Sequence, residues 1–212
     1  MATISRETAQ EQERVIPVMP ADWVPGPHQG GWTYEMYAAL PDDGRRYEVV
    51  QGVLMMSPAP EVSHQGIIQR ISRYLDERIF TPHFGLVLTG PTDVKLAIDT
   101  VVQPDVLVLL KEHLARIQEK HIAGNPDLAV EVISPGSATY DRLVKYHVYE
   151  QAGVPEYWLV NSKKQTVEVF VLEGGQYRSP GALHGEQLLQ SKVIPEPAIP
   201  VGQFFDWTGG LF

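Results

Sequence analysis

Two acidic residues interrupt apolar segments that should form strands of one sheet. Asp105 precedes the run Val106–Leu110, and Glu131 lies in the middle of Leu128–Ile133. A buried carboxylate without a partner is costly, so Glu131 needs a metal ion, a lysine or an arginine beside it. Two acids on adjacent strands can converge on one hard cation, and Mg²⁺ or Mn²⁺ prefers oxygen ligands. The pair therefore predicts a divalent-metal site, although a structural salt bridge would explain either acid alone.

Lys145 is the next candidate residue for this site. A short turn at residues 134–137 would send a helix back over the sheet. With about 1.5 Å of rise per helical residue, Lys145 lies roughly 10 Å from that turn, and Glu131 lies roughly 10 Å from it along the strand. The two side chains should therefore be level. Asp141, Lys145 and Tyr149 share one helix stripe, so an exposed Asp–Lys pair is the alternative interpretation.

The elements that would position these residues follow from the hydrophobic pattern. Apolar residues at helical spacing predict an amphipathic helix over about residues 63–80. Three strands are expected, over residues 86–98, 102–110 and 128–133, and the nearly unbroken apolar runs of the second and third predict a sheet covered on both faces. A helix over 138–152 and a strand over 156–160 should complete the core. The order is helix, three strands, helix, strand.

Shorter elements should flank this core on both sides. Thr33 can cap a short helix that ends near Leu40. Two apolar segments on either side of Gln51 and Gly52 predict a β-hairpin over residues 47–56. Strands over 166–172 and 176–178, joined by a glycine turn, should extend the sheet.

The domain organisation follows from these elements and from chain length. Residues 1–30 have few periodic apolar positions, so we expect a loosely ordered arm there. The proline-rich tail through Phe212 should lie over the surface. The sequence thus predicts one mixed α/β (α+β) domain over residues 31–212, with a core over about 63–161 and added hairpins at both ends.

Composition restricts the class of protein. The 212-residue chain has no cysteine, which excludes disulfides and thiolate zinc sites and is compatible with a cytoplasmic protein. No stretch of about 18 apolar residues is present, so no membrane association is expected. A net charge of −9 opposes sequence-independent nucleic-acid binding, because phosphate affinity comes mainly from clustered Lys and Arg. Local basic groups could still contribute, and they are Arg70, Arg73, Arg78, Lys111, Arg116 and Lys120.

Several segments in consistent order resemble the Uma-type restriction endonuclease family of the PD-(D/E)XK nuclease superfamily. They are TYEMYAALPDDGRRYEVVQGVLMMSPAPEVSHQ, VVQPDVLVLL, PDLAVEVISPGS and DRLVKYHVYEQAGVPEYWLV, over about residues 32–180. The resemblance implies a restriction-endonuclease-like fold. It also implies that Asp105, Glu131 and the carbonyl of Val132 hold Mg²⁺ or Mn²⁺, while a lysine assists the attacking water.

One position departs from the wider superfamily. Its lysine stands two residues after the second acid, where this chain has Ile133. In the resembling family a lysine on the following helix takes that role, and Lys145 matches it. The resemblance further implies roles for Glu48, as a metal ligand or water orienter, and for His64, as a contact to a phosphate or metal-bound water.

These observations predict a metal-dependent endonuclease that hydrolyses phosphodiester bonds, with DNA as the expected substrate. A homodimer would suit double-strand cleavage. Two alternatives stay open. Ile133 and the net charge of −9 would suit a catalytically silent nuclease fold that serves nucleic-acid or protein interactions. Two carboxylates could also act without metal, as in hydrolases of sugars.

Overall fold

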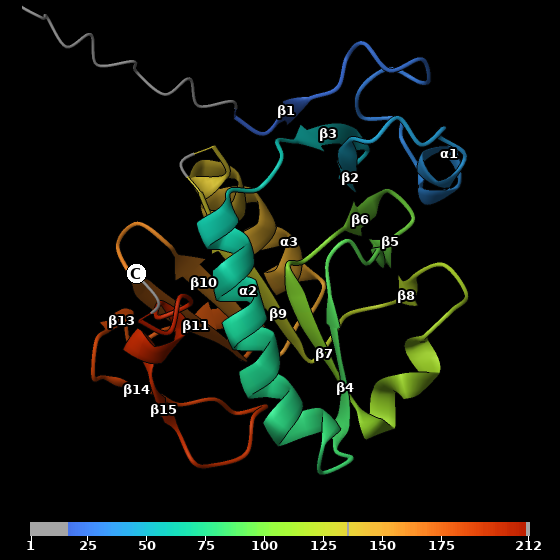
Figure 1. Cartoon of the computed structure of the whole chain (residues 1–212). Helices are drawn as coiled ribbons and strands as arrows, with labels where there is room; N and C mark the ends of the chain where they lie inside the picture. Colours follow the sequence, from blue (N-terminus) through green and yellow to red (C-terminus); the bar gives the residue numbers. More distant parts are fainter. Residues whose placement is uncertain (1–16, 135, 211–212) are drawn as a thin grey trace, which may run out of the picture.

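The computed structural model describes residues 17–134 and 136–210, which form three β-sheets with helices packed on them (Figure 1). The central sheet contains β4 (Gly85–Thr89), β7 (Val106–Leu110), β9 (Leu128–Ile133), β10 (Glu156–Asn161), β11 (Thr166–Glu173), β12 (Gln176–Arg178) and β13 (Ala182–His184). Its order is β12-β11-β10-β9-β7-β4, with β13 also beside β11. β9 and β10 pair in parallel, whereas β7 and β9, which carry the candidate acids, pair antiparallel.

A second sheet packs against this one. It contains β1 (Met19–Pro20), β2 (Arg46–Val50), β3 (Val53–Ser57), β5 (Val94–Ala97), β6 (Thr100–Val102) and β8 (Ile122–Ala123), in the order β1-β3-β2-β6-β5-β8. The predicted hairpin is confirmed as β2 and β3, which pair in register around Gln51 and Gly52. The third sheet consists of β14 (Leu188–Leu189) and β15 (Ile199–Pro200).

Two of the predicted strands are wrong as single elements. The segment 86–98 is divided between β4 in the central sheet and β5 in the second sheet. The segment 102–110 is likewise divided between β6 and β7. Each break contains a proline, Pro91 or Pro104, and proline lacks the N–H that a continuing ladder would need. The second break is important for the site, because Asp105 lies in it, between the end of β6 and the start of β7.

Helices cover both faces of the central sheet (Figure 1). α2 lies on one face and α3 on the other. The helices of the described residues are α1 (Tyr34–Ala38), α2 (Val62–Leu75), α3 (Tyr146–Gln151), the π-helices η1 (Asp76–Phe80) and η3 (Tyr140–Lys145), and the 3₁₀ helices η2 (Lys111–Arg116) and η4 (Val201–Phe204). The predicted helices are confirmed, and Thr33 caps α1 by accepting from the N–H of Met36. The predicted helix over 138–152 is π-helical in its first half. No helix of the described residues is long and apolar enough to cross a membrane.

Alternation along β9 assigns its side chains to two cores. Val130 and Val132 pack with the residues of α2, whereas Ala129 and Ile133 pack on the opposite face with residues of α3. Successive side chains of a strand point to opposite faces. Glu131 therefore points to the face covered by η3 and α3, and this places its carboxylate under the helix that carries Lys145.

The C-terminal segment corrects the expectation of a surface tail. Ile194, Val201 and Phe204 are buried in the same core as α2 and the central sheet. Tyr74 of α2 meets Phe204 edge to face, with ring centroids 5.4 Å apart. The apolar positions of this segment are too far apart to form a periodic signal, so their burial depends on tertiary contacts alone.

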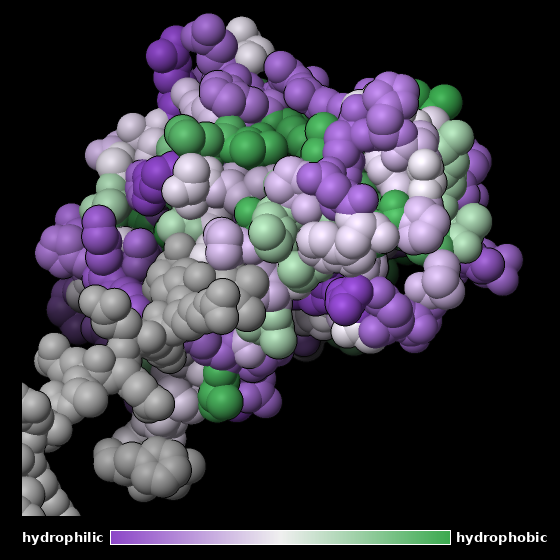
Figure 2. Space-filling view, turned by 90° about the horizontal axis from the view of Figure 1, so that it is seen from above, coloured by the Kyte–Doolittle hydropathy of each residue, from purple (hydrophilic) through white to green (hydrophobic). Residues whose placement is uncertain are grey.

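The N-terminal segment is described from residue 17 onward. β1 pairs with β3, and Ala21 is buried. The remainder of the predicted arm, residues 1–16, lies outside the described residues, and the domain boundary near residue 30 stays a prediction. Seen from above (Figure 2), the end of the molecule that carries the hairpin has a largely polar surface in which apolar residues gather in one band.

Candidate active site

Asp105 lies where β7 ends its pairing with β9. The last paired residues there are Val106 and Val130, so the N–H of Val132 has no strand partner on that side. The carboxylate of Asp105 accepts this N–H instead, with Oδ2 2.8 Å from the Val132 nitrogen. Because the N–H and C=O of one strand residue point to the same edge, the Val132 carbonyl faces the same edge as Asp105.

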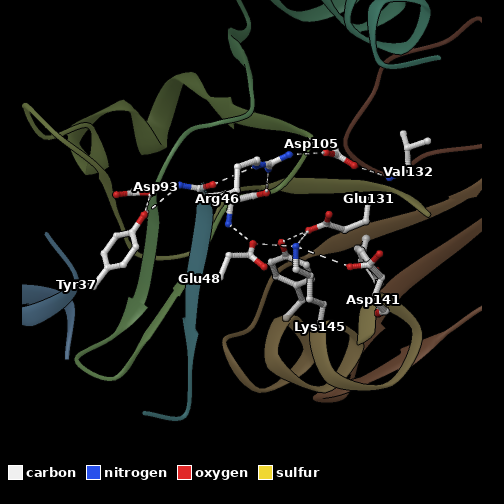
Figure 3. Close-up of polar contacts among 12 residues, drawn as sticks. Tyr37, Arg46, Glu48, Asp93, Asp105, Glu131, Val132, Asp141 and Lys145 are labelled. Carbon is white, nitrogen blue, oxygen red and sulfur yellow. Dashed lines mark hydrogen bonds and ion pairs between the residues drawn. The ribbon is translucent and has the colours of Figure 1, made fainter. Parts of the chain in front are cut away.

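Lys145 is buried among carboxylates (Figure 3). Its Nζ lies 2.8 Å from Glu131 Oε1, 2.9 Å from Glu48 Oε1 and 3.8 Å from Asp141 Oδ1. The hydroxyl of Tyr149 donates to the same Glu131 oxygen at 2.7 Å. The prediction that Lys145 and Glu131 are level is confirmed. The alternative of an exposed Asp–Lys pair is wrong, because both side chains are 5% exposed.

We use the term acidic cluster for Glu48, Asp105, Glu131 and Asp141, which are all buried. Burial raises the pKa of Glu131 well above its usual value and that of Asp141 to about 6, because a low-dielectric site disfavours the charged form. Burial opposes the ionisation of Asp105 too, but His64 and the Val132 N–H outweigh it and lower the pKa. Burial alone would lower the pKa of Lys145, and the surrounding carboxylates reverse that effect and raise it.

Two elements outside the central sheet complete the site. Glu48 comes from β2, where its Oε1 accepts the N–H of Gln103 at 2.6 Å, while its Oε2 is buried without a hydrogen-bond partner among the described residues. His64 comes from the start of α2. Its Nε2 lies 3.2 Å from Asp105 Oδ1, but the ring is not aligned for a hydrogen bond, so both ring nitrogens lack one within the described chain.

The structure therefore brings the six candidate site residues together. They line one cavity of about 50 Å³, and they are Glu48, His64, Asp105, Glu131, Val132 and Lys145. Outside this cavity lie the candidate basic groups, which are Arg70, Arg73, Arg78, Lys111, Arg116 and Lys120. Since a water molecule occupies roughly 30 Å³ in the liquid, the cavity has room for a single small ion or for one or two waters. The convergence involves both sheets and two helices, so no local segment could form it.

Sequence reasoning missed Arg46. Its NH1 atom lies 3.9 Å from Asp105 Oδ1, and the residue lines the same cavity. A signal was present: Arg46 stands two residues before Glu48 on one strand, and such residues point to the same face. Gln103 had no comparable signal, because it contacts Glu48 through its backbone N–H, at the break between β6 and β7.

The donor atoms of this cavity suit a hard divalent cation. Four buried carboxyl groups face one buried lysine and the partly exposed Arg46, so oxygen ligands outnumber the cationic side chains. Lys145 and Tyr149 both bind Oε1 of Glu131, so Oε2 takes no part in either bond. Among the described residues, no three His, Asp or Glu side chains converge as a ready-made metal-binding group. Mg²⁺ does not require one, since it is usually held by one or two carboxylates and several waters.

Comparisons with known proteins agree with this architecture. The Uma2 family model, described as "Putative restriction endonuclease", matches residues 34–202. Among solved structures, the chain is similar to a crystal structure described as a "putative nuclease belonging to DUF820" from Anabaena variabilis, with a TM-score of 0.71. That alignment has 18% sequence identity and covers 83% of this chain and 98% of the other, so it shows a shared fold. No curated protein matches. Because the family model covers most of the chain, this protein belongs to the Uma2 family and has its restriction-endonuclease-like fold.

Proposed function

We propose that this protein is a metal-dependent endonuclease that hydrolyses phosphodiester bonds in DNA. The observation that carries the proposal is the contact between Lys145 and Glu131, next to Asp105 and the Val132 carbonyl edge. Two acids that can hold a metal ion and one lysine that can stabilise developing charge suit phosphodiester hydrolysis. Family membership supports the same reaction class, because the description of the family is "Putative restriction endonuclease".

In this proposal Asp105, Glu131 and the Val132 carbonyl hold Mg²⁺ or Mn²⁺. When bound, the ion would polarise the phosphoryl oxygen and make a bound water more acidic. Binding of the ion to Glu131 would weaken the ion pair between Glu131 and Lys145. The lysine ammonium could then donate to the attacking water or to the oxygen that gains charge in the transition state.

Arg46 and Glu48 have complementary roles in the proposal. Arg46 is 30% exposed and lies at the rim of the cavity, where its guanidinium can donate two parallel bonds to the phosphate being cleaved. The unpaired Oε2 of Glu48 can orient a water in the cavity. His64 holds the ionised form of Asp105, because it lowers the pKa of that carboxyl.

Nicking of supercoiled plasmid DNA tests the proposal. Wild-type protein should nick or cut the plasmid in Mg²⁺ or Mn²⁺ and should be inactive in a chelator. Asp105→Asn and Lys145→Met should each lose at least about 100-fold in rate, the scale found for removal of a group that stabilises transition-state charge. Lys164→Met changes an exposed lysine outside the cavity and serves as the matched control. Full activity of both site variants, or activity in the chelator, contradicts the proposal.

A catalytically silent module is the second candidate function. It is favoured by one observation: Lys145 already compensates Glu131 and Glu48, so part of the acidic cluster is satisfied without a cation. Titration calorimetry separates the two candidates. Heat of Mn²⁺ binding that disappears in Asp105→Asn supports the nuclease, whereas no Mn²⁺ binding by the folded wild-type protein supports the silent module.

A further inference from the structure

A second cavity lies next to the candidate active site. Its volume is about 310 Å³, and its lining includes Tyr37, Pro41, Arg46, Tyr47, Asp93 and Gln103. Arg46 lines both cavities. In Figure 3, Tyr37 and Asp93 lie on one side of Arg46, and Asp105 lies on the other. Arg46 is thus a lining residue common to the two cavities.

We propose that this second cavity, called the side pocket, binds one unpaired nucleobase of the substrate strand beside the phosphodiester that is cleaved. The inference rests on the proposed nuclease function and adds a substrate class to it. It requires a substrate that is single-stranded or locally unpaired at the cleavage site.

Gln103 and Arg46 connect the side pocket to the acidic cluster. The backbone N–H of Gln103 donates to Glu48, and its side-chain amide donates to Asp93 at 2.8 Å. Arg46 Nε donates to Gln103 Oε1 at 3.4 Å, while its NH1 approaches Asp105. A phosphate held by Arg46 would therefore have the acidic cluster on one side and the side pocket on the other. A base attached to the neighbouring sugar could enter that pocket.

The lining of the side pocket suits the ring and the edge of a base. Tyr37 provides a partly exposed aromatic wall and Pro41 adds an apolar one, whereas Tyr47 also lines the pocket but is largely buried in the core. Bases stack on aromatic side chains whatever their sequence. The hydroxyl of Tyr37 donates to Asp93 Oδ1 at 2.8 Å, and the Gln103 amide binds the same oxygen. Asp93 Oδ2 takes part in neither bond, so it can accept from an exocyclic amino group, as carboxylates do from cytosine.

The requirement for an unpaired base follows from the shape of the binding site. A base within a duplex presents only its edges in the grooves, so its ring can enter a pocket only after it leaves the stack. The volume of the side pocket lies at the lower end of the range for small-ligand sites, about 300–1,000 Å³. It suits one base rather than a base pair.

Binding of 12-nucleotide DNA in Ca²⁺ or in a chelator, followed by fluorescence anisotropy, tests the inference on the full chain. The probes are oligo-dC, oligo-dT and an oligomer of abasic residues with the same charge. Wild-type protein should bind oligo-dC about tenfold more tightly than the abasic oligomer, the scale of one stacked base. Tyr37→Ala should abolish this ratio and leave the abasic affinity unchanged, whereas Tyr37→Phe, which keeps the ring, should retain it.

Asp93→Asn tests the recognition of the base edge. It should bring oligo-dC and oligo-dT to equal affinity, because an amide can donate to a thymine carbonyl as well as accept from an amino group. Phe84→Ala removes an exposed aromatic outside the side pocket and should change none of the ratios. Circular dichroism identifies a variant that fails to fold. If Tyr37→Ala fails to fold, the affinity ratios measured for Tyr37→Phe and Asp93→Asn test the inference.

The outcomes separate the side pocket from the nuclease proposal. Equal wild-type affinity for oligo-dC and the abasic oligomer, together with plasmid cleavage, overturns the side pocket alone. A preference for oligo-dC over oligo-dT that persists in Asp93→Asn also overturns it. Absence of both oligonucleotide binding and plasmid cleavage overturns the two proposals together.

Discussion

Lys145 and Glu131 form a buried ion pair between helix η3 and the central strand β9, with 2.8 Å between Nζ and Oε1. The same ammonium binds Glu48 of the second sheet. One lysine therefore joins a helix and both sheets at the candidate active site. The contact has consequences for stability as well as for catalysis, because removal of one partner leaves charges buried without compensation.

Lys145→Met should lower the free energy of unfolding by about 3–5 kcal/mol, the usual cost of breaking a buried ion pair. Addition of Glu48→Gln should recover part of this loss, because it removes one of the unpaired charges. Chemical denaturation of the metal-free protein measures both effects. Lys164→Met, which changes an exposed lysine, should stay within about 0.5 kcal/mol of wild type. A Lys145→Met protein as stable as that control would show that the lysine is not buried among acids.

Mn²⁺ should stabilise the folded protein through Asp105. At a free concentration about 100 times its dissociation constant, a ligand of the native state adds about 2.7 kcal/mol. Thermal unfolding with and without Mn²⁺ measures this as a shift in Tm. Asp105→Asn should remove the shift, whereas Asp206→Asn, an exposed acid outside the cavity, should retain it. Equal Tm shifts in the two variants would show that Mn²⁺ binds at a site without Asp105.

Asp141 should make the metal-free protein more stable in mild acid. Its pKa is raised to about 6 from about 3.9 in an unfolded chain. Between these values the native state binds more protons than the unfolded state, so stability falls as pH rises through this window. The difference corresponds to about 3 kcal/mol at most. Unfolding between pH 4.5 and 7.5, at about 0.5-unit steps, should show a smaller decline in Asp141→Asn than in wild type. An identical decline in Asp141→Asn and wild type would show that Asp141 does not cause the pH dependence.

Glu156 should be a main anchor of the C-terminal segment. The side chain is fully buried, and its two oxygens accept from the Trp158 indole at 2.6 Å and the Lys192 backbone at 2.7 Å. Glu156→Ala leaves both donors unpaired, at a cost of about 1–3 kcal/mol each. Glu156→Gln keeps one acceptor and should lose less. Urea unfolding measures the difference, and no loss in Glu156→Ala would show that the segment is held by its apolar contacts alone.

Much of the framework was predictable from local patterns. The apolar runs around Asp105 and Glu131 identified two adjacent strands, and counting residues from the turn placed Lys145 level with Glu131. These inferences succeeded because strand and helix rise are constant along the chain. The same patterns failed at Pro91 and Pro104, where one apolar stretch serves two sheets. Hydrophobic periodicity indicates which side chains are buried, but it does not indicate to which sheet their strand belongs.

The sequence by itself determined which chemical groups are present and which of them share a strand or a helix face. It predicted that Asp105 and Glu131 lie on adjacent strands and that Lys145 is level with Glu131, whereas a role for Glu48 followed only from the family resemblance. Only the tertiary structure decided that Lys145 points inward, that Glu48 and Arg46 come from a second sheet, and that Gln103 links the acidic cluster to the side pocket. The physical reason is that these contacts join residues far apart in the chain, and their geometry depends on how two sheets pack rather than on any local propensity.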